Sequence, residues 1–168
     1  MIETHPFGVF IPPQAKYLLL GSFTGKGIYN WFYGTKRNQF WPILETVYQT
    51  KLTDKKPQQQ LFTQLRLAIA DIIYQCERIK GNNLDTNLTN IVYNIIPIQK
   101  IFETHNIHTV YFSSRFVEQK FRLLFKNIIE KFPAIVYVTL PSPSPRYAAL
   151  SLNEKIKIYA QVLPNLYA

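Results

Sequence analysis

Residues 17–41 constrain the fold most, because they combine features of a buried strand, a glycine-rich loop and a helix start. The apolar run at 17–20 is too short to span a membrane and is typical of a strand buried on both faces. Pro42 is tolerated only in the first turn of a helix, which places the helix start near Phe40. Loops that follow strands in open α/β sheets form binding sites. The sequence therefore predicts a binding loop at 23–38.

The rest of the chain alternates between the two periodicities. Leu65, Ile69, Ile72 and Cys76 recur at helical spacing and predict a helix over 61–77. Together these patterns predict one three-layer α/β/α domain, residues 1–168, around a mainly parallel four-stranded sheet. The predicted strands are 17–22, 91–96, 108–113 and 135–140, and the predicted helices are 40–49, 61–77, 98–105, 114–132 and 151–163.

The composition favours an anionic partner. Lys and Arg number 19 against 10 Asp and Glu, so the formal net charge is +9. Such an excess favours nucleic acid through counterion release, although solubility alone would also explain it. Cys76 is the only cysteine, which excludes an internal disulfide and a cluster with four cysteine ligands. Without a targeting or membrane-spanning segment, we expect a cytoplasmic protein, or a nuclear one in a nucleated cell, with no membrane partner.

Several familiar motifs are absent. The stretch GSFTGKG resembles a phosphate-binding loop, but its glycines and lysine have the wrong spacing. His105 and His108 have no further ligand in register, so a zinc site is not expected there. Ser142 and Ser144 do not lie in the GxSxG turn of a serine hydrolase. We therefore expect neither a metal nor a cofactor.

Two stretches, 21–42 and 140–151, carry the functional signal. Both follow predicted strands, so both are expected at one edge of the sheet. Together they contain aromatic, amide, hydroxyl and basic side chains. A pocket of this composition suits a base extruded from a nucleic acid, with Tyr33 stacking on the ring and an amide reading its polar edge.

The order of these motifs resembles the uracil-DNA glycosylase superfamily, nearest its hypoxanthine-DNA and mismatch-specific branches. The first motif reads GSFTG at 21–25 and YGTKRNQFW at 33–41, and the second is the serine- and proline-rich loop LPSPSPRYA at 140–148. A weaker match covers 65–88, where an Asp, a Cys and an Arg precede an Asn-rich turn. The matches follow the family's order over most of the chain.

The resemblance implies a metal-independent enzyme that hydrolyses the N-glycosidic bond of uracil or hypoxanthine in DNA. Tyr33 matches the aromatic residue that stacks on the flipped base, Asn38 matches a catalytic Asn, and Arg146 matches a residue of the wedge loop. We expect a monomer whose partner is DNA containing a damaged base. The predicted site comprises Asn38 as catalytic residue, Ser22, Phe23 and Tyr33 for the base, and Lys36, Arg37, Ser142, Ser144 and Arg146 for DNA.

The departures from the family leave alternatives open. Phe23 stands where many branches have a catalytic Asn or Asp, which favours an inactive DNA-binding module of the same fold. An enzyme acting on nucleosides or RNA would need neither the Arg146 wedge nor the charge excess. Helix capping alone would explain Asn38. Asp71 is expected to be a structural hydrogen-bond acceptor rather than a catalyst.

Overall fold

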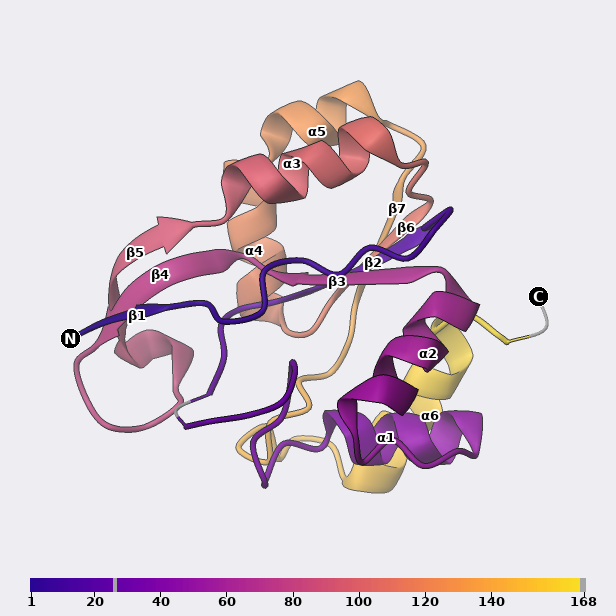
Figure 1. The fold of residues 1–168 in the computed structure, drawn as a ribbon, viewed down its shortest axis with the longest axis horizontal. Coiled ribbons are helices and arrows are strands. Elements are labelled where there is room, and N and C mark those ends of the chain that lie inside the picture. Colours follow the sequence, from indigo (N-terminus) through magenta and orange to yellow (C-terminus); the bar gives the residue numbers. More distant parts are fainter. Residues whose placement is uncertain (26, 167–168) are drawn as a thin grey trace.

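The computed structural model describes residues 1–25 and 27–166, and Figure 1 shows helices packed on both sides of a central sheet. All neighbouring strands of this sheet are parallel, in the order β3-β2-β6-β7. The arrangement confirms the predicted α/β class with a four-stranded parallel sheet. Its strands are β2 (Tyr17–Gly21), β3 (Leu67–Asp71), β6 (Thr109–Phe112) and β7 (Val136–Thr139).

Side chains that alternate along the strands fill two separate cores. Leu18 and Leu20 face one core, and Leu19 between them faces the other. Three helices cover each core, and the two groups of helices lie on opposite sides of the sheet in Figure 1. The first group is α3 (Ile95–Thr104), α4 (Arg115–Leu124) and α5 (Lys126–Lys131), and the second is α1 (Phe40–Tyr48), α2 (Lys55–Leu65) and α6 (Leu152–Val162).

A smaller antiparallel sheet extends beyond β3. Its strands are β1 (Ile2–Thr4), β4 (Ile73–Arg78) and β5 (Leu88–Tyr93), in the order β1-β4-β5. The chain crosses from one sheet to the other at Ile72, whose N–H donates to the Gly21 carbonyl at 2.8 Å. The 3₁₀ turn η1 (Asp85–Asn87) precedes β5. The two sheets therefore meet where β2 and β3 end.

The predicted helix over 61–77 is wrong beyond Leu65. Arg66 takes a left-handed conformation with φ of 56° and closes α2 by donating to the Phe62 and Thr63 carbonyls. All residues of β3 are buried, so its apolar run is that of a central strand covered on both faces. The spacing that suggested a helix arises because two strands, β3 and β4, follow each other directly.

Two other predicted boundaries are corrected. The strand predicted at 91–96 ends at Tyr93 and belongs to the antiparallel sheet, while Pro97 lies in the first turn of α3. The helix predicted over 114–132 is divided at Phe125. The Phe125 N–H donates to the Phe121 carbonyl and ends α4. The parallel sheet thus has the predicted number of strands, but β3 occupies the place expected of 91–96.

The predicted helix starts on either side of the binding loops are confirmed. α1 begins at Phe40, with Pro42 in its first turn. Ser151 and Glu154 form a reciprocal capping box at the start of α6. Ser114 caps α4 by accepting from the Val117 N–H at 3.4 Å. These caps fix the points at which the chain leaves the loops.

Candidate active site

The parallel strands converge on a pocket of about 510 Å³ at their carboxyl ends. Each strand places a polar residue in its lining, at or shortly after its last position. These residues are Ser22 after β2, Asp71 at the end of β3, Ser113 after β6 and Ser142 after β7. This is the edge where open parallel sheets bind their ligands.

The structure brings the predicted site residues together around this pocket. Tyr33, Asn38 and Arg146, which lie far apart in the sequence, all contribute to its lining. The exposed side chains of Lys36, Arg37 and Arg146 form a basic rim. Ser22, Phe23, Ser142 and Ser144 complete the predicted set in the lining.

Asn38 is held at the junction between the pocket and α1. Its side-chain oxygen accepts a hydrogen bond from the Phe40 N–H at 2.9 Å, so Asn38 supports the start of α1, although the N-cap residue itself is Gln39. A carbonyl oxygen has two lone pairs, and the amide group also carries two N–H donors. Asn38 therefore keeps hydrogen-bonding capacity for a ligand or a water molecule.

The Tyr33 ring packs against the first residue of α1. Its backbone has a φ of 57°, and its ring stacks on Phe40 with a centroid distance of 4.2 Å. Its hydroxyl is buried in the pocket lining, near the Ser113 side chain and the Asp71 carboxylate. Burial and then the charge of Asp71 raise the pKa of Tyr33 well above its ordinary value, so the hydroxyl remains a donor. Tyr33 therefore contributes a buried hydroxyl donor to the pocket lining.

Gly21 leaves room for this arrangement. A Cβ added there would lie 2.6 Å from the Tyr33 hydroxyl and would collide with Asp71 Oδ1. Both oxygens therefore lie over the same backbone position at the pocket floor. A glycine is needed at the end of β2 because two polar side chains approach this position closely.

The sequence analysis did not find the buried pair His5 and Asp71. His5 Nε2 lies 2.6 Å from Asp71 Oδ2, and both side chains are almost completely buried. The Phe7 N–H donates to His5 Nδ1 at 3.2 Å, so the ring proton is on Nε2 and is donated to Asp71. Asp71 is thus an acceptor in this pair, as predicted, but it also lines the pocket. The pairing spans 66 residues and leaves no local sequence pattern.

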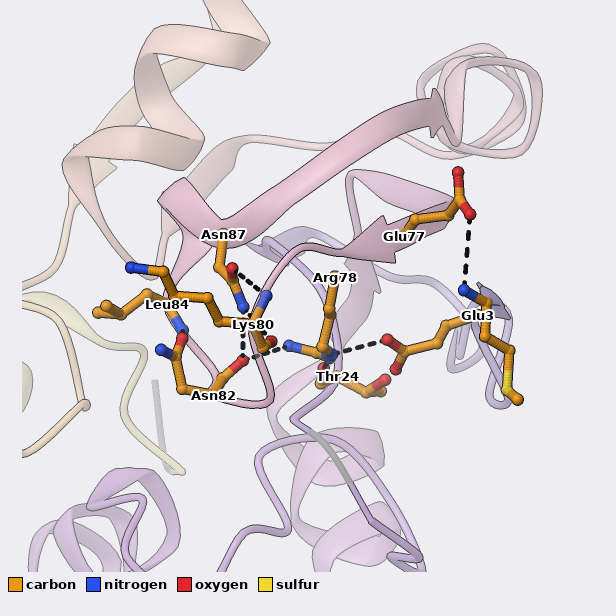
Figure 2. A network of polar contacts seen from close by, with 9 residues as sticks. Glu3, Thr24, Glu77, Arg78, Lys80, Asn82, Leu84 and Asn87 are labelled. Atoms are coloured by element: carbon orange, nitrogen blue, oxygen red, sulfur yellow. Dashed lines mark hydrogen bonds and ion pairs between the residues drawn. The ribbon is translucent and has the colours of Figure 1, made fainter.

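Phe23 and Arg78 hold the glycine-rich loop against the small sheet. The Arg78 guanidinium lies 5.6 Å from the centroid of the Phe23 ring and donates to the Thr24 carbonyl at 2.6 Å. It also pairs with Glu3 at 2.8 Å and donates to the Asn82 carbonyl at 3.2 Å. Figure 2 shows Arg78 between Glu3, Thr24 and Asn82. Phe23 therefore packs as part of the scaffold while one side of it lines the pocket.

A second carboxylate, Asp85, lies on the pocket wall. It accepts a hydrogen bond from the Ser22 hydroxyl at 2.8 Å, which joins η1 to the loop after β2. Burial raises the pKa of the Asp85 carboxyl, although the bond from Ser22 opposes that shift. One oxygen of Asp85 is thus already engaged by the protein.

The serine- and proline-rich loop is ordered by its own backbone and by α6. The Ser142 and Ser144 side chains accept the N–H groups of Ser144 and Arg146, both at 3.2 Å. The Gln39 N–H donates to the Pro143 carbonyl at 2.8 Å, which ties this loop directly to the start of α1. The hydroxyl groups keep their own protons as donors toward a ligand.

A buried lysine that sequence reasoning missed strengthens this tie. Lys155 is 1% exposed, and its ammonium donates to Gln39 Oε1 at 2.8 Å and to the Ser144 carbonyl at 3.1 Å. Burial lowers the pKa of this ammonium. The Lys155 ammonium therefore joins the two loops that carry Asn38 and Arg146.

We expect Lys155→Met to loosen the 141–147 loop, because methionine keeps the apolar stem but donates no hydrogen bonds. Hydrogen exchange should accelerate about tenfold at the backbone N–H groups that this loop offers and at Gln39, as loss of a charge-assisted hydrogen bond predicts. The loop amides are those of Ser142, Ser144, Arg146 and Tyr147. Lys157→Met is the matched control, because Lys157 is exposed on the same helix and carries the same charge. Equal exchange rates in the two variants would show that Lys155 does not order the loop.

Known structures include one of similar architecture. A solution structure from Methanosarcina acetivorans, titled a "putative Uracil DNA glycosylase", superposes with a TM-score of 0.72 over 100% of both chains at 17% sequence identity. The fold is uracil-DNA-glycosylase-like. At this identity the likeness shows the fold alone. No family model and no curated protein matches the sequence.

Residues 1–25 and 27–166 contain neither a candidate metal site nor a candidate membrane span. No group of three or more His, Cys, Asp and Glu side chains there is arranged to hold a metal ion. Within the same ranges, no helix has the length and hydropathy needed to cross a bilayer.

Proposed function

We propose that the chain is a DNA glycosylase of base-excision repair that hydrolyses the N-glycosidic bond of a deaminated base, uracil or hypoxanthine, flipped out of DNA. The convergence of Tyr33, Asn38 and Arg146 on one pocket of a uracil-DNA-glycosylase-like fold is the observation that supports this most directly. The volume of about 510 Å³ is within the range of small-ligand sites.

The proposed reaction needs only water and the residues of the pocket. The flipped base stacks on Tyr33, while Asn38 orients a water molecule toward C1′ of the sugar. The C1′–N bond breaks, and its electron pair leaves with the base, which then takes up a proton from solvent. The water oxygen bonds to C1′ and loses a proton to solvent. The products are the free base and an abasic site. An amide is a poor base, so positioning is the role that Asn38 can perform.

The rim of the pocket provides the contacts to DNA. Lys36 and Arg37 are exposed beside Asn38, where they can bind the phosphates flanking the flipped nucleotide. The Ser142 and Ser144 hydroxyl groups can donate hydrogen bonds to phosphates of the same DNA backbone. Arg146 is exposed at the end of its loop, where it can enter the space that the base leaves in the duplex. These phosphates also favour the cationic sugar of the transition state.

A cleavage assay tests this proposal. The protein is incubated with single-stranded and duplex oligonucleotides that carry uracil or hypoxanthine opposite each base, followed by alkali. We expect alkali-labile breaks at the lesion and none in undamaged DNA. Binding of the same duplexes should weaken steeply with salt, because several phosphate contacts release counterions.

A DNA-binding module that does not cleave is the second candidate, and Phe23 is the observation that favours it. Its side chain has no amide or carboxylate to offer a water molecule at this loop position. The ring packs instead against Arg78 and His5. Salt-sensitive binding to lesion-containing duplexes without any alkali-labile breaks would support this candidate and rule out the glycosylase.

A further inference from the structure

One step of the proposed reaction still needs a group to perform it. The attacking water loses a proton, and the Asn38 amide can orient that water but is too weak a base to take the proton. The carboxylates in the pocket lining are Asp71 and Asp85. Asp71 is paired with His5 at the floor, whereas Asp85 lies on the wall. Asp85 is therefore the side chain to consider as the proton acceptor.

The turn between β4 and β5 holds Asp85 against the pocket. The Asn87 side chain accepts from the Lys80 N–H at 2.6 Å and donates to the carbonyls of Lys80 and Asn82 (Figure 2). Asn87 is 6% exposed, so these bonds are shielded from water. Arg78, which also binds the glycine-rich loop, donates to the Asn82 carbonyl. The turn is therefore tied internally and to its neighbour, and it gives the Asp85 side chain a firm support.

The Ser22 hydroxyl determines which oxygen of Asp85 is available. It donates to Oδ1 at 2.8 Å, so this oxygen faces the loop after β2. Among the described residues Ser22 is the donor to this carboxylate, and Oδ2 keeps its lone pairs for a water molecule. The carboxylate is thus oriented by one oxygen and reactive through the other.

Asp85 lies between the floor of the pocket and its mouth. Asp71 at the floor is 4% exposed, and Asp85 is only partly buried. Lys36 and Arg146 at the mouth are exposed, and there the sugar remains joined to the DNA. Burial raises the pKa of Tyr33, and the charges of Asp71 and Asp85 add to that shift, so both carboxylates lie near the ring proposed to stack on the base. We therefore expect C1′, which joins base and sugar, at the level of Asp85.

The groups around Asp85 make its carboxylate a stronger base than an exposed one. Burial raises the pKa of the Asp85 carboxyl, and the hydrogen bond from Ser22 opposes this shift. Of the charged groups packed against it, Asp71 on β3 raises the pKa further and Arg78 on β4 lowers it. Tyr33 stays neutral and adds no charge. A carboxylate in such surroundings accepts a proton from water more readily than an exposed carboxylate does.

We propose, on the basis of the glycosylase function above, that Asp85 is the catalytic base that takes a proton from the attacking water. Asn38 orients the water toward C1′, and one water O–H donates to Asp85 Oδ2. The C1′–N bond breaks and its electron pair leaves with the base, while the water oxygen bonds to C1′ and its proton passes to Asp85. The departing base takes up a proton from solvent, and Asp85 then releases its own proton to solvent, which restores the carboxylate.

A binding measurement tests the position of Asp85 without any cleavage. Duplexes with a cationic pyrrolidine abasic site, whose ring nitrogen replaces C1′, or with a neutral tetrahydrofuran site are titrated into the full chain at one salt concentration. The wild type should bind the cationic site at least tenfold more tightly, because the Asp85 carboxylate faces that charge. Asp85→Asn should lose most of this preference. Asp54→Asn should keep it, because Asp54 is exposed and lies outside the pocket lining.

Single-turnover excision tests the proton transfer itself. Asp85→Asn should excise uracil or hypoxanthine about a hundredfold more slowly than the wild type. The wild-type rate should decline in acid as Asp85 becomes protonated, and the rate of Asp85→Asn should not. Ser22→Ala removes the hydrogen bond that lowers the pKa of Asp85, so its acid decline should begin at a higher pH. A purely structural role of Ser22 would not move that decline.

The outcomes separate this inference from the proposed function. Wild-type excision rates in folded Asp85→Asn would overturn the role of Asp85 and leave the glycosylase function intact. A wild type that excises neither base would overturn both. If Asp85→Asn does not fold, equal affinity of the wild type for the two abasic duplexes overturns the inference, as does an acid decline that Ser22→Ala leaves in place.

Discussion

Replacing Asn38 with alanine is expected to slow single-turnover excision of uracil or hypoxanthine by about a hundredfold, because the water molecule loses the group that orients it. The variant also loses the hydrogen bond from the Phe40 N–H, which should lower the free energy of unfolding by about 1 kcal/mol. Rates are measured with enzyme in excess over a lesion-containing duplex, and stability by urea denaturation.

Asn38→Ser distinguishes catalysis from capping. Serine accepts the same backbone N–H, so the start of α1 should remain intact, but its shorter side chain does not extend to the water. We expect Asn38→Ser to unfold like the wild type and to react as slowly as Asn38→Ala. Wild-type excision rates in Asn38→Ser would limit Asn38 to a structural role.

The second large effect concerns stability. His5→Ala should lower the free energy of unfolding by about 2–3 kcal/mol, because it removes the hydrogen bond that His5 donates to the buried Asp71 carboxylate. The loss should appear as a lower midpoint of urea denaturation with an unchanged slope. His108→Ala is the control, because His108 is exposed. A change below about 1 kcal/mol in His5→Ala would mean that the pair contributes little to folding.

Local patterns were sufficient to predict the two loops of the site. A short apolar strand before Gly21, and Pro42 near a helix start, indicated the loop that the structure places at the pocket. The capping box at Ser151 fixed the end of the second loop. These signals depend on neighbouring residues alone, so a single sequence contains them.

The parts that could not be predicted depend on contacts between distant segments. The helix predicted over 61–77 was wrong beyond Leu65 because the buried residues of two consecutive strands, β3 and β4, reproduced a helical spacing. His5 reaches Asp71 across 66 positions, and Lys155 reaches Gln39 across 116. A histidine near a terminus and a lysine in an amphipathic helix have no unusual local surroundings. Their roles become visible only when the strands bring those segments to one edge of the sheet.

The long-range ties to His5 and Lys155 also bear on protein synthesis. The ribosome makes the chain from its N-terminus, so Asp71 can meet His5 well before Lys155 has been translated. The floor of the pocket can therefore form on a nascent chain while the loop carrying Arg146 still lacks its anchor. A partly synthesised chain would have the floor of the pocket without the ordered 141–147 loop. If the pocket binds DNA as proposed, that binding would be deferred until translation of α6 is complete.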